Sequence, residues 1–210
     1  MQNTLENNTK TLTLKIYNDS DCECPIGESG DESERILLFR KGSTFYADIY
    51  DYFHVNEDKE VVPDTIRLQR QLDCETAFVV SCYEHGAVHY SLQGEGSSCP
   101  WDSTSFAGIY WLPSDVTPER RKSYARGMME SFTDWCNGNC FGYVLEDESG
   151  EEIDSCWGFI GDDHIIDVLK NDTLPHLKEI GYVLESIEDG DETGLPYNIE
   201  YKLQEFMSPK

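Results

Sequence analysis

The sequence predicts an α+β protein in which an antiparallel β-sheet meander packs against two or three helices. Runs rich in Val, Ile, Tyr and Phe alternate with turn residues over 76–113 and again over 140–161. Between them, residues 117–136 carry an apolar stripe at helical spacing. The apolar fraction of 39%, with 12% aromatic residues, supplies enough side chains for a packed core in a chain of 210 residues.

The N-terminal part is expected to start with a flexible tail over 1–10, followed by a half-buried strand at TLTLKIY, residues 11–17. Residues 19–34 are rich in Gly, Ser and acids, which is typical of a loop. A short apolar run, ILLFR, occupies 36–40. The segment TFYADIYDYFHV at 44–55 fits a short amphipathic helix or a strand.

Three further runs predict strands: TAFVVSCYE at 76–84, AVHYSL at 87–92 and FAGIYWLP at 106–113. Successive strands joined by short turns usually pair as an antiparallel meander. The clearest helix follows, with Thr117 as its N-cap and Pro118 at the first helical position. Its predicted apolar stripe consists of Tyr124, Met128, Phe132 and Trp135.

In the C-terminal part, CFGYVLED at 140–147 and EEIDSCWGFIG at 151–161 predict a hairpin around a tight turn. We expect a short helix from Asp162 or Asp163, then a strand at YVLESIE, residues 182–188, and a last alternating strand at PYNIEYKLQEF, residues 196–206. Because no repeat and no Pro- or Ser-rich linker divides the chain, we predict a single domain over 1–210. Two subdomains meeting near residue 115 are the alternative.

The charge balance is extreme, since 41 acidic residues face 16 basic ones and the formal net charge is −25. It is also polarised: residues 127–210 hold 20 acids and 4 bases, whereas residues 1–126 hold 21 acids and 12 bases. Self-repulsion at this level costs stability, so the acidity calls for a reason. Three simple explanations are high solubility, adaptation to a salty environment and acidic residues in solvated loop tips. The alternative is a surface that imitates a polyanion.

Outward residues on a strand recur every second position, which sets carboxylates ~6.6 Å apart, near the phosphate spacing of DNA. The acids of the C-terminal part therefore form our predicted partner-binding surface. Its members are Glu146, Asp147, Glu148, Glu151, Glu152, Asp154, Asp162, Asp163, Asp167, Glu185, Glu188, Asp189, Asp191 and Glu192.

Other chemistry has weaker signals. The Cys and His pairs of the sequence, Cys22-x-Cys24, His85-x3-His89 and Cys136-x3-Cys140, lack zinc-site spacing, so we expect no metal and no cofactor. Cys99, in GEGSSCPWD, with His85 or His89, could form a Cys/His pocket of a small enzyme. We predict no catalytic residues, and the chain opens with no apolar leader, so we expect a cytoplasmic protein with reduced thiols.

Several segments resemble uncharacterised proteins carried by bacteriophages and mobile elements: HYSL at 89–92, CPWD at 99–102, WCNG at 135–138 and SCWGF at 155–159. This resemblance spans roughly the middle third of the chain and brings no catalytic motif with it. The acidic composition is separately similar to that of anti-restriction and anti-CRISPR proteins that act as DNA mimics.

From the charge and these likenesses we predict an anti-defence inhibitor that acts in the cytoplasm of the host cell. Its expected partner is a basic nucleic-acid-binding protein, such as a restriction or CRISPR nuclease. We expect no direct binding of nucleic acid and no membrane association. A homodimer would lengthen the acidic face. The alternatives are the small enzyme and a non-catalytic phage protein-interaction domain.

Overall fold

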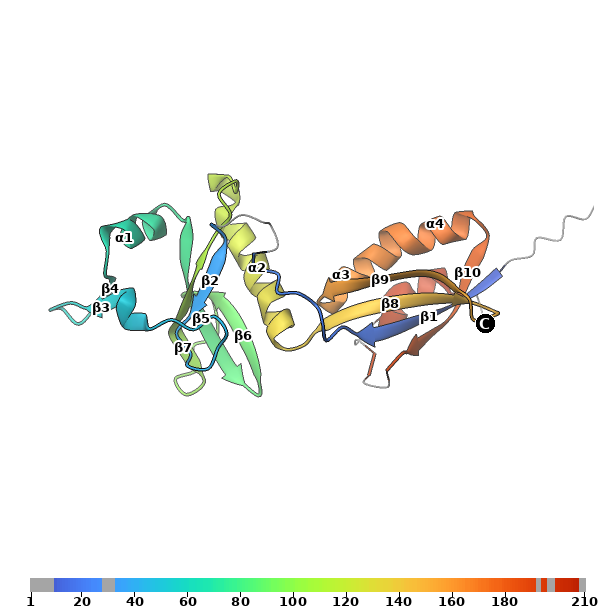
Figure 1. Cartoon of the computed structure of the whole chain (residues 1–210), viewed down its shortest axis with the longest axis horizontal. Helices are drawn as coiled ribbons and strands as arrows, with labels where there is room; N and C mark the ends of the chain where they lie inside the picture. Colours follow the sequence, from blue (N-terminus) through green and yellow to red (C-terminus); the bar gives the residue numbers. More distant parts are fainter. Residues whose placement is uncertain (1–9, 28–32, 192–193, 196–198, 208–210) are drawn as a thin grey trace, which may run out of the picture. The chain divides into compact units, whose positions relative to one another are not determined.

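The computed structural model describes residues 10–27, 33–191, 194–195 and 199–207, and it confirms the α+β class (Figure 1). The chain forms two compact units. Unit 1 comprises Met1–Glu23 and Gly138–Lys210, and unit 2 comprises Cys24–Asn137.

We predicted one domain or a boundary near residue 115, but the chain crosses between the units at 23–24 and 137–138, and residue 115 lies inside unit 2. The N-terminal strand pairs with strands from the C-terminal part, so unit 1 is built from two separate stretches of the chain. A search for one linker between two consecutive domains therefore misses this division. Most of the predicted flexible tail lies outside the described residues.

Unit 1 contains a four-stranded sheet with the order β10-β1-β8-β9. Its strands are β1 (Lys10–Asn18), β8 (Cys140–Asp147), β9 (Glu152–Ile160) and β10 (Tyr182–Asp189). The central strand β1 runs antiparallel to β8 and parallel to β10. In this register Leu12 lies opposite Asp147 and Ile16 lies opposite Asp189, so β8 and β10 end at opposite ends of the sheet.

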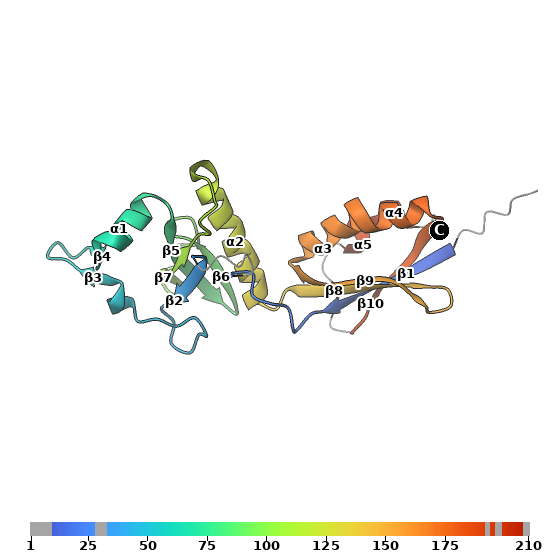
Figure 2. The same cartoon turned by 45° about the horizontal axis from the view of Figure 1, so that its top comes forward.

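The helices of unit 1 lie on one face of this sheet (Figures 1 and 2). They are α3 (Asp162–Val168), a π-helical segment at Leu169–Thr173, α4 (Leu174–Glu179) and α5 (Ile199–Leu203), which a 3-10 turn at Gln204–Phe206 follows. The predicted strand at 196–206 was therefore wrong for its described part. Ile199 and Leu203 fit both a period of two and a helical i, i+4 spacing, and the helix buries both while Tyr201 stays exposed.

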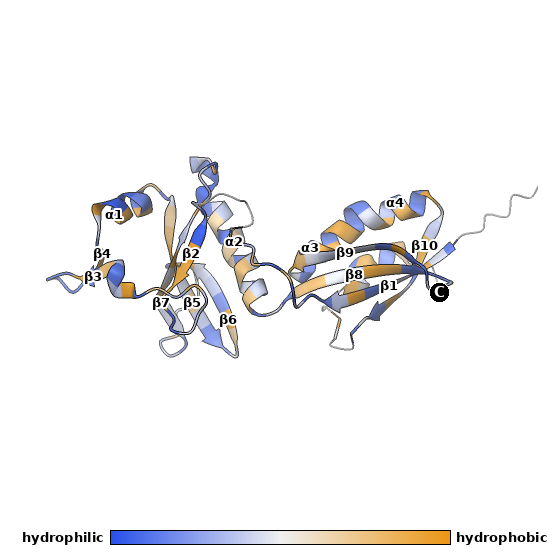
Figure 3. Ribbon diagram, in the orientation of Figure 1, coloured by the Kyte–Doolittle hydropathy of each residue, from blue (hydrophilic) through white to orange (hydrophobic). Residues whose placement is uncertain are grey.

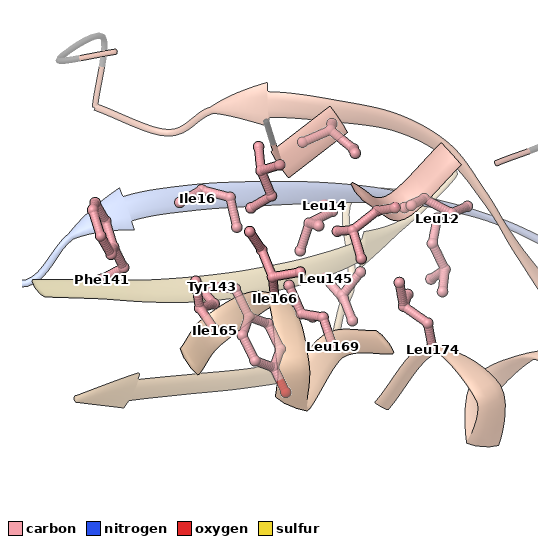
Figure 4. Packing of buried hydrophobic residues seen from close by; sticks show 14 of the residues in the cluster. Leu12, Leu14, Ile16, Phe141, Tyr143, Leu145, Ile165, Ile166, Leu169 and Leu174 are labelled. Atoms are coloured by element: carbon pink, nitrogen blue, oxygen red, sulfur yellow. The ribbon is translucent and has the colours of Figure 1, made fainter. Parts of the chain in front are cut away.

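The core of unit 1 forms between the sheet and these helices (Figure 4). Alternate residues of β1, namely Leu12, Leu14 and Ile16, point into it and are almost fully buried. They pack with Tyr143 and Leu145 of β8 and with the helical residues Ile165, Ile166, Leu169 and Leu174. The opposite face of the sheet consequently carries the other residues of each strand.

Unit 2 contains a second four-stranded sheet, with the order β2-β7-β5-β6, and a small β3-β4 hairpin. Its strands are β2 (Arg35–Leu38), β3 (Phe53–Val55), β4 (Val61–Pro63), β5 (Ala77–His85), β6 (Ala87–Leu92) and β7 (Ser103–Trp111). All pairs are antiparallel. β7 pairs with β5 and not with its chain neighbour β6, so the strand order differs from that of a strictly sequential meander.

Unit 2 covers both faces of its sheet. The helix α2 (Arg121–Cys136), preceded by a 3-10 turn at Pro118–Arg120, buries Ala125, Met129 and Phe132 against one face. The other face packs against α1 (Ile66–Asp73), the β3-β4 hairpin and the 3-10 turn at Ile49–Asp51. The ambiguous segment at 44–55 thus holds both a helical turn and a strand. Helices α2 and α4 each mix hydrophobic and hydrophilic residues, as amphipathic helices do (Figure 3).

The outer edge of β6 is bonded to side chains of α2. Asn137, just after the helix, accepts from Val88 N at 3.0 Å and donates to Val88 O at 2.8 Å. Thr133 Oγ1 accepts from Tyr90 N at 2.9 Å. These bonds occupy backbone groups to which another chain's strand could otherwise pair.

Candidate partner-binding surface

Six of the predicted binding carboxylates lie on the β8-β9 hairpin. We call this set, Glu146, Asp147, Glu148, Glu151, Glu152 and Asp154, the hairpin group. Because β8 runs antiparallel to β1, the hairpin turn lies beside the start of β1. The β8-β9 turn was predicted at 148–150, and the structure confirms a turn between the two strands there.

Hydrogen bonds hold several carboxylates of the hairpin group in place. Asp147 Oδ1 accepts from Ser149 Oγ at 2.6 Å, Ser149 N at 2.8 Å and Glu151 N at 3.1 Å, and these bonds lower the pKa of Asp147. Glu148 accepts from Thr11 N and Thr11 Oγ1 at 3.2 and 3.1 Å. These two carboxylates therefore have fixed positions, and the lowered pKa of Asp147 favours its charged form.

Two members of the hairpin group do not point freely into solvent. Glu146 forms an ion pair with Lys15 of β1 at 2.7 Å, which raises the pKa of the lysine. Asp154 accepts from Tyr143 OH at 2.8 Å. The expected row of outward carboxylates along these strands is thus interrupted, since one acidic residue of each strand is bonded to a side chain of unit 1.

A second set of predicted residues lies at the opposite end of the sheet. We call Asp162, Asp163, Asp189 and Asp191 the strand-end group, because they lie at or just after the ends of β9 and β10. Asp191 accepts from Asn18 N at 2.8 Å, and Asp189 accepts from Gly194 N at 2.6 Å. Asp163 forms an ion pair with Lys202.

The remaining predicted residues lie elsewhere on unit 1. Asp167 is on α3 and accepts from Asn171 at 2.6 Å, while Glu185 and Glu188 are exposed on β10. Glu192 lies outside the described residues. The hairpin and strand-end groups are separated along β1 by the four residue steps from Leu12 to Ile16, or ~13 Å at ~3.3 Å per residue. The structure therefore assembles two acidic groups and not one cluster.

The division of charge follows the division of the fold. Unit 1 holds 22 acidic and 6 basic residues, a net of −16, whereas unit 2 holds 19 acidic and 10 basic residues, a net of −9. The polarisation seen in the sequence is thus largely a property of unit 1.

A row of alternating aromatic and glycine residues, which we call the aromatic row, crosses the sheet of unit 1. Tyr17 of β1 pairs with Gly142 of β8, and the rings of Tyr17 and Trp157 are 5.6 Å apart. A Cβ atom on Gly142 would lie 2.1 Å from the Trp157 ring, and one on Gly190 would lie 2.4 Å from the Tyr17 ring. Each ring therefore lies on a glycine of the neighbouring strand or its end.

We did not predict the aromatic row as a site, although the sequence held two signals for it. Tyr17 occupies the polar phase of the alternation in TLTLKIY, which puts it on the face away from the core. Gly142 stands inside a strand pattern, and an isolated strand glycine often marks close approach by another group.

The sequence has a basic cluster over 120–126, and it is partly neutralised within unit 2. Glu95 accepts two bonds from Arg126, both at 2.7 Å, and lies 3.2 Å from Lys122 Nζ. This contact lowers the pKa of Glu95 to about 2, chiefly through the Arg126 hydrogen bonds. A stretch that could have attracted phosphates is thereby partly paired with a carboxylate.

The proposed Cys/His pocket is assembled around a carboxylate. Cys99 Sγ and His85 Nδ1 each lie 3.4 Å from Asp102 Oδ2, while His89 is exposed on β6 and pairs with Tyr83 of β5. Because Asp102 stands between the thiol and the imidazole, the geometry differs from a Cys–His pair in which the imidazole takes the thiol proton. The adjoining cavity, of about 250 Å³, is lined mainly by small residues of the 94–100 loop and of the start of β7.

Both cysteine pairs of the sequence are divided between the two units. Cys22 belongs to unit 1 and Cys24 to unit 2, and Cys136 and Cys140 are divided in the same way. Burial raises the pKa of Cys136 to about 12, so this thiol stays protonated at neutral pH. In the described ranges, no group of three or more His, Cys, Asp or Glu residues is arranged to hold a metal ion.

No family model, curated protein or solved structure matches this chain. Among the helices that the structure describes, none is long and apolar enough to cross a membrane.

Proposed function

We propose that this protein is a polyanion mimic that occupies the basic nucleic-acid-binding groove of a partner protein. The observation that carries the proposal is the net charge of −16 on unit 1, with carboxylates anchored by hydrogen bonds to backbone N–H groups. Fixed negative groups pay less ordering entropy on binding than mobile ones. The acidic field would also give fast, salt-sensitive association.

The class of partner comes from the same chemistry. A protein that binds DNA gains much of its affinity from phosphate contacts, so its groove is lined with Lys and Arg. Restriction and CRISPR nucleases have such grooves, and an inhibitor from a phage or mobile element that blocks them would act as an anti-defence protein. The two acidic groups, ~13 Å or more apart, would engage separate basic clusters along one groove.

The test is competition with DNA. A panel of purified restriction and CRISPR nucleases is incubated with a fluorescent duplex and increasing amounts of the full chain, at low and high salt. We expect displacement of the duplex from at least one nuclease, together with inhibition of cleavage, and weaker displacement at high salt. If the chain displaces duplex from none of them at low salt, the proposal is wrong for this class of partner.

A pair of charge-matched variants locates the surface. Glu151→Gln/Glu152→Gln removes two exposed charges from the hairpin group, and Glu57→Gln/Asp58→Asn removes two exposed charges from unit 2. We expect the first to weaken inhibition about fivefold, or ~1 kcal/mol, and the second to have a much smaller effect. Equal effects would mean that only total charge matters and that the hairpin group is not the contact surface.

A thiol enzyme is the second candidate, favoured by the contact of both Cys99 and His85 with Asp102. In such an enzyme Asp102 would have to accept the thiol proton. Cys99→Ala would then abolish activity without unfolding the protein, whereas the polyanion mimic predicts that this substitution leaves duplex displacement unchanged.

A further inference from the structure

We infer that the aromatic row of unit 1 is a binding site for an arginine side chain of the partner. This inference rests on the proposed function and gives it an anchoring contact. The guanidinium would lie against the rings of Trp157, which is 49% exposed, and Tyr17, which is half-buried, while its N–H groups reach the neighbouring carboxylates.

The first support is the construction of the row. In the order β9-β8-β1-β10, the residues are Trp157, Gly142, Tyr17 and, just past the end of β10, Gly190. Three atoms of the six-membered ring of Trp157 lie within 2.8 Å of the position that a Gly142 Cβ would occupy. Three atoms of the Tyr17 ring lie within 2.6 Å of the corresponding position on Gly190. Each ring therefore covers a glycine of the adjacent strand or its end.

The second support is exposure. Trp157 is 49% exposed although it belongs to a sheet, whereas Trp111 in the sheet of unit 2 is 4% exposed. No described helix of unit 1 lies over this face, because α3, α4 and α5 all pack on the other side (Figures 1 and 2). Exposed Trp and Tyr are the residue types that most often dominate the energy of a protein interface.

The third support is the charge around the rings. Asp19 Oδ2 accepts from Gly158 N at 2.9 Å, which fixes this carboxylate beside Trp157. Asp191 accepts from Asn18 N, next to Tyr17, and Glu188 of β10 lies opposite Lys15 in the strand register. Aromatic faces bordered by anchored carboxylates fit a cation that is also planar.

These features favour arginine over the alternatives. A guanidinium stacks on aromatic faces and donates from five N–H groups, whereas the ammonium of lysine is compact and strongly hydrated. Aromatic residues on a sheet face can also stack the bases of single-stranded nucleic acid. Here the carboxylates and the net charge of −16 on unit 1 would repel its phosphates.

The experiment titrates the full chain with nona-arginine, nona-lysine and a ten-nucleotide oligothymidine, using calorimetry at fixed salt. We expect Trp157→Ala to weaken nona-arginine binding about fivefold and nona-lysine binding by less than twofold. Trp101→Ala is the matched control, since Trp101 is 91% exposed in unit 2 and the substitution leaves the net charge unchanged. It should change neither affinity.

Trp157→Leu guards against an unfolding artefact, because leucine still covers Gly142 but has no aromatic face. A folded Leu variant, as judged by circular dichroism, should show the same selective loss for nona-arginine. Equal losses for the two peptides, equal effects of the Trp157 and Trp101 variants, or tight binding of the oligothymidine would each overturn the inference. If the Trp157 variants bind nona-arginine normally while the hairpin variant loses nuclease inhibition, the inference fails and the proposed function stands. If the unsubstituted chain displaces duplex from no nuclease but its preference for nona-arginine depends on Trp157, the proposed function fails and the arginine site stands.

Discussion

Unit 1 and unit 2 use four-stranded sheets in different ways. The sheet of unit 2 has a hydrophobic cluster on each face, and its β6 edge is bonded to side chains of α2. The sheet of unit 1 buries one face against helices and carries Tyr17 and Trp157 on the other. A sheet covered on both faces leaves little of its surface exposed for a partner to contact. This difference is why we place the proposed binding surface on unit 1.

The units differ in the same way in their handling of carboxylates. In unit 2, Glu34 is 5% exposed and accepts from Tyr110 OH at 2.7 Å, so its carboxyl group is hydrogen-bonded inside the fold. In unit 1, the carboxylates of Asp147 and Asp191 are anchored by backbone N–H groups near the surface. The first arrangement stabilises a fold, and the second presents charge at a fixed place.

A large cavity in the core of one unit tests whether the two units are stabilised independently. Phe132 of α2 is fully buried and lies within ring contact of Phe45, Tyr90 and Trp135. We expect Phe132→Ala to destabilise unit 2 by ~3–5 kcal/mol, because it removes apolar burial and leaves a void. Amide hydrogen exchange would measure the loss residue by residue.

The matched variant is Leu145→Ala in the fully buried core of unit 1, with an expected cost of ~2–5 kcal/mol. Each substitution should accelerate exchange mainly in its own unit. Equal acceleration over both units in both variants would show that the chain unfolds as one cooperative body, against the division drawn here.

A smaller effect tests the handling of carboxylates. Tyr110→Phe removes the hydroxyl that donates to buried Glu34, and we expect the free energy of unfolding to fall by ~1–3 kcal/mol, the usual cost when a buried polar group loses a hydrogen-bond partner. Tyr143→Phe in unit 1 removes the corresponding bond to Asp154. Since Asp154 is less buried than Glu34, we expect Tyr143→Phe to lower the free energy of unfolding by less than Tyr110→Phe does, as measured by urea unfolding. A larger loss from Tyr143→Phe would contradict the contrast between an internal and a surface carboxylate.

Much of the fold was predictable because strand alternation and turn residues are local signals. The predicted strands at 87–92 and 140–147 coincide with β6 and β8, and the predicted helix after Thr117 corresponds to the 3-10 turn and α2. The division into units was not predictable, since the pairing of β1 with β10 joins residues more than 170 positions apart. No local pattern encodes such a contact.

The candidate surface was predicted in composition but not in arrangement. The sequence locates the acids of unit 1, but it does not show that Glu146 pairs with Lys15 or that Asp154 binds Tyr143. The first contact depends on the register between β1 and β8, and the second on the register between β8 and β9. The aromatic row escaped prediction for the same reason, because Trp157 meets Gly142 and Tyr17 only once three strands are aligned.

The ion-paired carboxylate of Glu95 in unit 2 makes a small, pH-dependent contribution to stability. Glu95 receives both of its Arg126 bonds at 2.7 Å, and its pKa falls from 4.5 to about 2 in the folded protein. A carboxyl whose folded pKa lies below its unfolded value stabilises the fold at every pH above about 4.5, and this stabilisation disappears as the pH falls towards 2. The side chain is 27% exposed, so solvent screening limits the contribution to ~1 kcal/mol.

Glu95→Gln should therefore lower the stability of unit 2 by ~1 kcal/mol at pH 7 and flatten its stability curve between pH 4.5 and 2, as measured by urea unfolding at several pH values. The control is Gln93→Glu, which adds an exposed acid in the same turn without the arginine contact. If Glu95→Gln raised stability instead, relief of repulsion in a chain of net charge −25 would outweigh the ion pair. The contrast between carboxylates that stabilise unit 2 and carboxylates that present charge on unit 1 would then not hold for Glu95.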